Sequence, residues 1–252
     1  MTAPVKSADR TVLILEAFAE AREPLALSEL ARRIGIPVSA CHGLVRTLGA
    51  RGYLCEVGPR RGYYPTQRWL DKARLIAGRD PLLERAAPVM EALAAATGET
   101  VVLAKRAGAA TLYLKVIESR HAVRYSAQAG DQKPLHASSI GKAILLQLPP
   151  AEREALLAGT RLARFTPNTL TSRERLEQDL AAGLKRGWTH SRGENVPDVH
   201  AIAVPLRIAG EPYGLAVAGP EHRMTPNLAR HAKRLLVAGP RIGEGSAGGS
   251  GD

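Results

Sequence analysis

Residues 28–54, "SELARRIGIPVSACHGLVRTLGARGYL", decide the fold of the N-terminal part of the chain. They predict two short helices separated by a tight turn, because Gly35 suits a left-handed helix stop and Pro37 suits a helix start. Ser28 is expected to cap the first helix, and Gly52 is expected to end the second. Two helices joined by a short turn that contains glycine are typical of a DNA-binding helix-turn-helix.

Segments on both sides of this stretch extend it to a winged helix-turn-helix. Residues 9–20, "DRTVLILEAFAE", place apolar side chains at three-residue steps and predict a helix capped by Ser7 or Asp9. Residues 24–27, "PLAL", indicate a short extended piece. Residues 52–66, "GYLCEVGPRRGYYPT", indicate two strands around a loop. The predicted order is therefore helix, strand, helix, turn, helix and hairpin.

A second, larger α/β domain is expected after a linker helix. The predicted elements change from helices to strands of an antiparallel meander, and then to further helices around a hairpin that turns at residues 209–210. The expected fold class is α+β, with a mainly antiparallel sheet in this second domain. The predicted strands of the meander are 99–106, 110–118 and 122–130, the hairpin strands are 200–208 and 211–219, and the helices are 81–98, 135–148, 171–187 and 226–239.

These assignments divide the chain into four parts. The expected DNA-binding domain covers residues 1–66, and the linker helix covers residues 67–80. The second domain covers residues 81–243. Residues 244–252 are expected to form a flexible tail, because a segment so rich in Gly and Ser does not order itself.

Composition narrows the class of protein. The chain has 252 residues, of which 45% are hydrophobic and 23% are charged, so it can bury one large core or two ordinary ones. No apolar run approaches the roughly eighteen residues of a membrane span, and the N-terminus lacks a signal-peptide core, so a cytoplasmic protein is expected. The two cysteines form neither a CxxC pair nor a zinc-finger spacing, so neither a disulfide framework nor a structural zinc is expected.

The net charge favours a polyanionic partner. Thirty-five Lys and Arg residues against 24 Asp and Glu residues give the chain a charge of +11. A protein that is merely basic is the alternative. The excess is spread along the chain, since residues 1–66 hold nine basic and six acidic residues, so charge alone does not locate a nucleic-acid site.

Helical geometry separates Cys41 from His42, the one place where a cysteine and a histidine are adjacent. Neighbouring residues on a helix project about 100° apart, so the two side chains lie on different faces. Cys41 falls on an apolar stripe with Leu44, Val45 and Leu48, and it is expected to be buried as a small hydrophobe that shares no metal with His42. The outward, polar stripe consists of Ser39, His42, Gly43 and Arg46.

This polar stripe suits the major groove of DNA, although a solvated face of mixed polarity is the alternative. Arg46 can contact guanine through two hydrogen bonds or hold a phosphate, and Ala40 can touch a thymine methyl. Gly43 costs about 1 kcal/mol in a helix relative to Ala, and its missing side chain lets the backbone approach DNA closely. Further DNA contacts are expected from Ser28, Arg32 and Arg33 on the preceding helix and from Arg60 and Arg61 in the wing.

The order of elements, together with "LHASSIGKA" (residues 135–143) and "AIAVPLRIAGEPYGLAVAGP" (residues 201–220), resembles the IclR family of bacterial transcriptional regulators. The likeness extends from about residue 7 to residue 243. It implies a winged helix-turn-helix, a linker helix and a C-terminal GAF/profilin-like domain that binds a small effector, usually an organic acid or an aromatic catabolite. It also implies homodimers or homotetramers that act on palindromic operator DNA as repressors, activators or both.

Two positions of the reading helix depart from the family pattern. Val38 stands where the family often has a basic residue, and Gly43 stands where it often has an arginine. Both differences weaken the expected hold on phosphates and indicate an atypical operator sequence.

The effector pocket implied by the resemblance also departs from the family pattern. Members that bind small keto acids place Asp, Cys and Ser side chains at the positions of Ser191, Ala201, Ala216 and Ala218. Losing polar groups there favours a more apolar ligand, while the helix start after Ser138 suits a carboxylate, so a carboxylate or phenol on an aromatic or aliphatic body is expected. The expected effector-binding residues are Ala122, Tyr125, Ser138, Ser139, Ile140, Gly141, Ser191, Val199, Ala201, Ala216 and Ala218.

Two patterns in the sequence are compatible with catalysis or metal binding. Ser139 and Lys142 match the S-x-x-K pattern of penicillin-recognising enzymes, but the companion motifs S-D-N and K-T-G are absent. Lys142 is therefore expected to lie along a helix with its charged head in solvent.

A metal site near the pocket mouth is the second pattern. The spacing of its candidate ligands matches no standard motif, so ordinary polar residues at strand ends are favoured, and no metal or other cofactor is expected. The competing function is an enzyme or metal-dependent sensor that uses the C-terminal domain chemically. The candidate ligands are His136, His190, Glu194 and His200.

Overall fold

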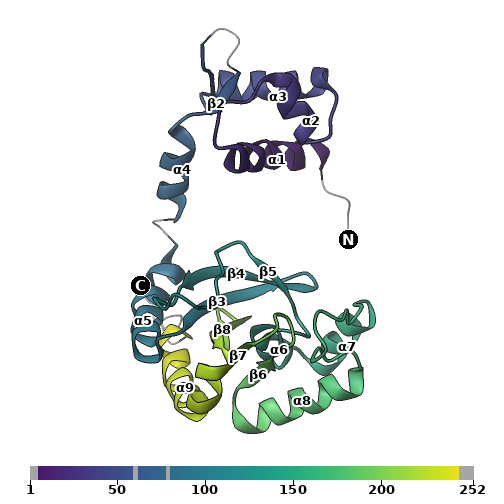
Figure 1. Ribbon diagram of the computed structural model, residues 1–252. Coiled ribbons are helices and arrows are strands. Elements are labelled where there is room, and N and C mark those ends of the chain that lie inside the picture. Colours follow the sequence, from purple (N-terminus) through teal and green to yellow (C-terminus); the bar gives the residue numbers. More distant parts are fainter. Residues whose placement is uncertain (1–4, 59–61, 78–79, 244–252) are drawn as a thin grey trace, which may run out of the picture. The chain divides into compact units, whose positions relative to one another are not determined.

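The computed structural model describes residues 5–58, 62–77 and 80–243 (Figure 1). Contacts within the chain divide it into two compact units, Met1–Asp80 and Pro81–Asp252. Within the described residues, none of the helices has the length and apolar character needed to cross a membrane.

The first unit has the order of elements that the sequence predicts, and the expected winged helix-turn-helix is confirmed. Strands β1 and β2 pair antiparallel, and Leu25 adds a bridge to Tyr63 through backbone hydrogen bonds of 3.1 and 2.9 Å. The elements are α1 (Lys6–Ala21), α2 (Leu27–Arg33), α3 (Val38–Ala50), β1 (Leu54–Glu56), β2 (Tyr63–Pro65) and α4 (Arg68–Ala77).

A single apolar core holds the three helices of this unit together. Ile14 of α1, Leu30 of α2 and Cys41 of α3 are fully buried in it. The predicted burial of Cys41 is thus confirmed, and burial raises the pKa of its thiol. Cys41 is therefore part of the packing of the helix-turn-helix.

Two predicted helix caps are wrong. Helix α1 begins at Lys6 after Val5, because the amide of Asp9 already bonds to the carbonyl of Val5, so Ser7 lies inside the first turn. Helix α2 begins one residue before Ser28, with Ala26 at the cap, because the amide of Leu30 bonds to the carbonyl of Ala26. In both cases the backbone closes the first turn without a capping side chain.

Helix α4 packs onto the hairpin of the first unit through Trp69. The indole N–H of Trp69 donates to the carbonyl of Tyr53 at 2.9 Å, and the two rings lie 4.4 Å apart between centroids. The guanidinium of Arg68 lies over the Tyr53 ring, 5.2 Å from its centroid. These contacts fix the direction in which the chain leaves the winged helix-turn-helix.

The second unit is a six-stranded antiparallel sheet with helices on both faces (Figure 1). Its strand order is β5-β4-β3-β8-β7-β6, so the expected antiparallel sheet is confirmed. Its elements are α5 (Pro81–Thr97), β3 (Thr100–Ala107), β4 (Ala110–Ile117), β5 (Gln132–Pro134), α6 (Ser139–Leu145), α7 (Pro150–Ala158), α8 (Arg173–Arg186), β6 (Thr189–Arg192), β7 (Val199–Ile208), β8 (Glu211–Pro220) and α9 (Glu221–Gly243).

Side-chain alternation along the central strands builds two different cores. On β8, Leu215 and Val217 pack against α5 and α9, whereas Ala216 and Ala218 face the other side, where α6 lies. Alternation follows from the pleat of a strand, which sends successive side chains to opposite faces. Large side chains therefore fill the core under α5 and α9, and small ones leave room under α6.

The strand predicted at residues 122–130 does not form. Side chains hold the backbone of residues 122–130 instead. The hydroxyl of Thr100, for example, donates to the carbonyl of Tyr125 at 2.6 Å. The carboxylate of Glu118 accepts hydrogen bonds from the Ser126 hydroxyl at 2.6 Å and from the amide of Ala127 at 3.2 Å. The third strand of the meander is the shorter β5, and α7 and β6 are elements that the sequence reading did not predict.

Helix α6 approaches the preceding loop so closely that only glycine fits at residue 141. A Cβ atom there would overlap the backbone of Leu135. Gly43 on α3, in contrast, has open space where its Cβ would stand.

The two glycines therefore predict opposite stability changes. We expect Gly141→Ala to destabilise the second unit by about 1–3 kcal/mol, because backbone atoms cannot move aside as side chains do. We expect Gly43→Ala to stabilise the first unit by up to about 1 kcal/mol through helix propensity. Urea denaturation of both variants measures the difference, and a Gly141→Ala protein as stable as the wild type would contradict the close packing of α6.

Candidate functional site: an exposed reading helix and an enclosed pocket

The polar stripe predicted on α3 is exposed. Ser39, His42, Gly43 and Arg46 all lie at the surface, and Ala40 is half-buried beside them. The structure also places Thr47 on this surface, with its hydroxyl donating to the carbonyl of Gly43 at 2.9 Å. Because no atom comes near the missing side chain of Gly43, packing within the unit does not explain the glycine.

Arg32 and Arg33 of α2 share one carboxylate. Arg32 donates two hydrogen bonds to Glu29, of 2.9 and 2.7 Å, and Arg33 donates one of 2.7 Å. These hydrogen bonds lower the pKa of Glu29 to about 2. Exposed ion pairs of this kind are weak, so the arginines can exchange Glu29 for another anion.

Three further residues, Ser28, Arg60 and Arg61, are predicted to contact DNA. Ser28 is exposed on α2. Arg60 and Arg61 lie outside the described residues.

The second unit contains a small cavity of about 30 Å³ between the sheet and the start of α6. The structure brings most of the predicted effector residues together around it, but Ala122 is exposed elsewhere and Gly141 packs against the loop before α6. The lining residues are Val102, Tyr113, Tyr125, Ala137, Ser138, Ser139, Ile140, Ser191, Asn195, Val196, Val199, Ala201, Ala216 and Ala218.

Two tyrosines that face each other supply polar groups to this cavity. The hydroxyls of Tyr113 and Tyr125 lie 3.3 Å apart, and both side chains are buried. Burial raises the pKa of Tyr113, so its hydroxyl stays protonated and can donate a hydrogen bond. The sequence reading named Tyr125 but missed Tyr113, which the alternation of β4 places on the inner face.

The start of α6 is less open to a ligand than the sequence suggested. The hydroxyl of Ser138 caps the helix by accepting from the amide of Gly141 at 3.2 Å, and it donates to the carbonyl of Pro134 at 2.7 Å. The hydroxyl of Ser191 donates to the carbonyl of Ala137 at 3.1 Å. The two hydroxyls and the Gly141 amide are already hydrogen-bonded within the protein, so a carboxylate that used them would have to displace existing bonds.

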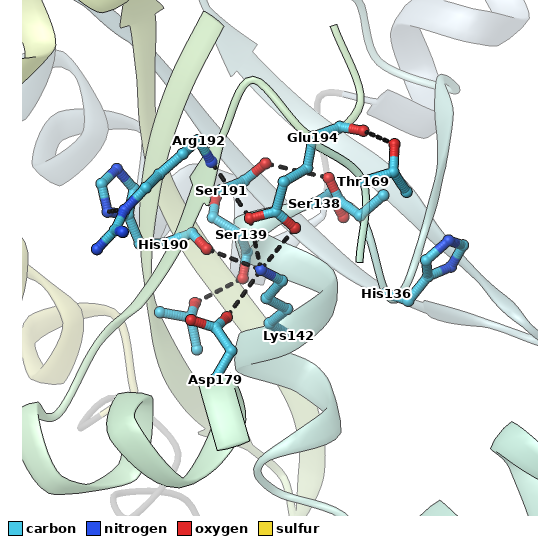
Figure 2. A network of polar contacts seen from close by, with 12 residues as sticks. His136, Ser138, Ser139, Lys142, Thr169, Asp179, His190, Ser191, Arg192 and Glu194 are labelled. Atoms are coloured by element: carbon cyan, nitrogen blue, oxygen red, sulfur yellow. Dashed lines mark hydrogen bonds and ion pairs between the residues drawn. The ribbon is translucent and has the colours of Figure 1, made fainter. Parts of the chain in front are cut away.

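The prediction that the charged head of Lys142 lies in solvent is wrong. Its side chain is fully buried, and Figure 2 shows its ammonium among polar partners. Its ammonium donates to Asp179 at 2.8 Å, to Glu194 at 2.8 Å and to the carbonyl of His190 at 2.9 Å. The prediction failed because α6 is a short helix that is buried on all sides, so it has no solvent face along which a lysine could lie. The three donors of the ammonium are all used, which leaves none for Ser139 and gives the S-x-x-K pattern a structural explanation.

The histidines near the pocket also have partners within the protein. The Nδ1 atom of His190 lies 3.1 Å from Nε of Arg192, which donates to it, and a ring nitrogen of His136 lies 3.0 Å from the carbonyl of Ala163. The Nε2 atom of His200 lies 3.7 Å from a carboxylate oxygen of Glu221. In the part of the chain that the structure describes, no three His, Cys, Asp or Glu side chains are grouped to hold a metal ion.

Comparison with protein families decides the class of this protein. Residues 75–242 match the model of the C-terminal domain of the bacterial transcriptional regulator IclR, and residues 7–57 match that of the IclR helix-turn-helix domain. The chain belongs to the IclR family of bacterial transcriptional regulators. This confirms the resemblance seen in the sequence.

Relatives within the IclR family align along nearly the whole chain. The HTH-type transcriptional regulator BhcR of Paracoccus denitrificans is 33% identical over 246 residues, which cover 96% of this chain and 88% of BhcR. The transcriptional repressor IclR of Escherichia coli is 30% identical over 242 residues, which cover 94% of this chain and 88% of the repressor.

Solved structures of family members share the fold. An IclR homologue from Microbacterium hydrocarbonoxydans, complexed with 4-hydroxybenzoate, has a TM-score of 0.78 and 27% identity, covering 94% of this chain and 98% of that one. The IclR of Thermotoga maritima has the same TM-score of 0.78 at 21% identity, covering 95% and 96%.

Buried histidines make the stability of this IclR-family protein dependent on pH. Burial lowers the pKa of His136, His190 and His231, and that of His190 falls to about 3. Each imidazole is therefore neutral when folded but gains a proton near pH 6.5 when unfolded. The unfolded state therefore binds more protons than the folded state. The contribution of these histidines to the free energy of unfolding is complete above about pH 6.5 and is lost as the pH drops from there toward 3.

Between about pH 7.5 and 5.5, the free energy of unfolding should fall in both proteins. We expect the fall to be smaller in His190→Gln than in the wild type, by about 1 kcal/mol. Urea denaturation at both pH values measures this difference. His42→Gln, which removes an exposed imidazole, is the control and should keep the loss on acidification, because the three buried histidines remain. An unchanged pH dependence in His190→Gln would show that His190 is not held neutral.

Proposed function

We propose that this IclR-family regulator binds operator DNA through the exposed face of α3 and binds an aromatic or aliphatic carboxylic acid or phenol in the enclosed pocket. Ligand binding would change the populations of the regulator's conformations or oligomers and so its hold on DNA. The observation that carries the proposal is a cavity with alanine walls and a pair of buried tyrosine hydroxyls.

The DNA half of the proposal rests on geometry that suits the major groove. Ser39, His42 and Arg46 project from the same exposed face of α3, and side chains of these types donate hydrogen bonds to base edges or phosphates. Gly43 lies between them with open space in place of a side chain, which allows close approach of the helix backbone.

The ligand half of the proposal rests on the chemistry of the walls. Ala201, Ala216 and Ala218 present methyl groups, which favour an apolar body. No charged side chain is among the described residues that line the cavity, so a ligand oxygen must bind to hydroxyl or amide groups such as those of Tyr113 and Asn195. The 4-hydroxybenzoate bound to the Microbacterium homologue has both the ring and the oxygens that such a pocket would accept.

Homodimers or homotetramers are part of this proposal, since palindromic operators need at least two reading helices. The winged unit in one chain offers a single α3.

Arg46→Ala should weaken binding to a DNA fragment from upstream of the regulator's own gene by about 10- to 100-fold, because a base or phosphate contact is lost. DNase footprinting and fluorescence anisotropy at two salt concentrations measure the effect. Arg175→Ala removes the same charge from the exposed surface of α8 and should leave the affinity within about twofold. Equal losses in both variants would mean that net charge, and not α3, holds the DNA.

A thermal-shift panel of organic acids tests the ligand class. We expect 4-hydroxybenzoate or related aromatic acids to stabilise the protein, by about 2.7 kcal/mol at a concentration 100 times the dissociation constant. Tyr113→Phe keeps the ring but removes a hydroxyl and should weaken such binding about tenfold. Stabilisation by glyoxylate or pyruvate, with none by any aromatic acid, would overturn the proposed ligand class.

A further inference from the structure

Residues 193–196, between β6 and β7, contribute two residues to the pocket wall and are attached to α6 by a buried ion pair. Asn195 and Val196 line the cavity, and Glu194, directly before them, meets Lys142 of α6. We propose that the Lys142–Glu194 ion pair is a positioning device that holds residues 193–196 against α6 and so limits the opening of the pocket. The role in ligand binding rests on the proposed function of this pocket.

The first support is the geometry around the lysine. Figure 2 shows the ammonium of Lys142 between Glu194 on one side and Asp179 of α8 on the other. Both Glu194 oxygens lie close to it, at 2.8 and 2.7 Å. The carbonyl of His190 takes the third donor at 2.9 Å, so β6, α8 and residue 194 all meet at a single cation.

The second support is that Glu194 is held at both ends. Its backbone carbonyl accepts from the hydroxyl of Thr169 at 2.6 Å, and the carbonyl of Gly193 accepts from that of Thr166 at 2.6 Å. The amide of Gly193 donates to the carbonyl of Val199 at 2.9 Å, which closes the connection between β6 and β7. With its backbone held by the threonines, Glu194 directs its carboxylate at Lys142, and one carboxylate oxygen also accepts from the amide of Arg192 at 3.3 Å. Residues 195 and 196 follow into the pocket wall.

The third support is the difference between the two carboxylates. The side chain of Glu194 is 7% exposed and precedes pocket residues, whereas that of Asp179 is 27% exposed and lies on α8, which contributes no residue to the cavity. Asp179 also lies 4.0 Å from Arg186, so it has a second cation nearby. Asp179 therefore anchors the lysine, and Glu194 transmits that anchor to the pocket wall.

Val196 stands where this wall meets solvent, with 37% of its surface exposed. A ligand of the proposed class must displace residues of the pocket wall, because the cavity of about 30 Å³ has room for little more than a water molecule. Releasing Glu194 from Lys142 would leave the threonine hydroxyls and the Gly193 amide to hold this segment, and we expect that weaker hold to let residues 193–196 move away from α6 while the sheet keeps its shape.

The test compares Glu194→Gln with Asp179→Asn in the full-length protein. Each variant removes one negative charge from Lys142 and keeps the size of the side chain, so the two are matched. Without any ligand, hydrogen–deuterium exchange should become at least five times faster in residues 193–199 of Glu194→Gln, with the Gly193 amide as reporter. In Asp179→Asn, the exchange rate of residues 193–199 should stay within twofold of the wild type, and any faster exchange should appear in α8.

Outcomes against this proposal are defined without reference to any ligand. Unchanged exchange in residues 193–199 of Glu194→Gln, or equal acceleration in both variants, would overturn it. Should Glu194→Gln fail to fold, Glu194→Asp replaces it, because it keeps the charge but shortens the side chain and takes the carboxylate away from Lys142. The exchange of β3 and β8 reports whether each variant is folded.

A second measurement uses 4-hydroxybenzoate as the probe. Glu194→Gln should change its dissociation constant by at least fivefold and speed its dissociation, whereas Asp179→Asn should keep the dissociation constant within twofold. If the ion pair had a purely structural role, the melting temperature of both variants would fall and the dissociation constant of 4-hydroxybenzoate would stay unchanged in each. If the wild type does not bind the probe, the proposed ligand fails and the exchange measurement alone decides on the Lys142–Glu194 ion pair.

Discussion

The register of the central sheet is the constraint on which the rest of the second unit depends. Because successive side chains of a strand face opposite sides, a shift by one residue would exchange Leu215 and Val217 with Ala216 and Ala218. The large side chains would then fill the pocket, and the alanines would leave the helices α5 and α9 without a core. One choice of register thus creates both the stable face and the hollow face of the sheet.

Close approach of α6 then turns the hollow face into an enclosed pocket. A Cβ atom at Gly214 of β8 would meet Ile140, and one at Gly141 would meet Leu135, so the helix lies nearer to sheet and loop than other residues would allow. The hydroxyl of Thr189 on β6 donates to the carbonyl of Ser139 at 2.6 Å and holds the start of the helix at that distance. The cavity remains open only where the alanines of β7 and β8 are too small to fill it.

Local patterns in the sequence predicted what local physics decides. The helix-turn-helix, the burial of Cys41 and the hairpin at Ala209 followed from helical spacing and turn residues, because these depend on neighbours in the chain. Tyr113 and Lys142 were misjudged because their roles depend on distant partners, Tyr125 in an extended segment and Glu194 beyond two further helices. Ala122 was misplaced because residues 122–130 are held by side chains and not by a strand ladder.

The buried lysine is better explained by positioning than by stability. Replacing a buried ion pair with apolar side chains of similar volume is often neutral or stabilising, since desolvation offsets the Coulombic attraction. Burial indeed raises the pKa of Glu194 while the ammonium of Lys142 opposes that shift, so the pair is not a free gain in stability. Apolar side chains can shift past one another at little cost, whereas three oxygen partners around one ammonium favour a single arrangement of α6, α8 and residue 194. A pocket wall held in one arrangement gives a ligand a defined shape to recognise and a defined state to change.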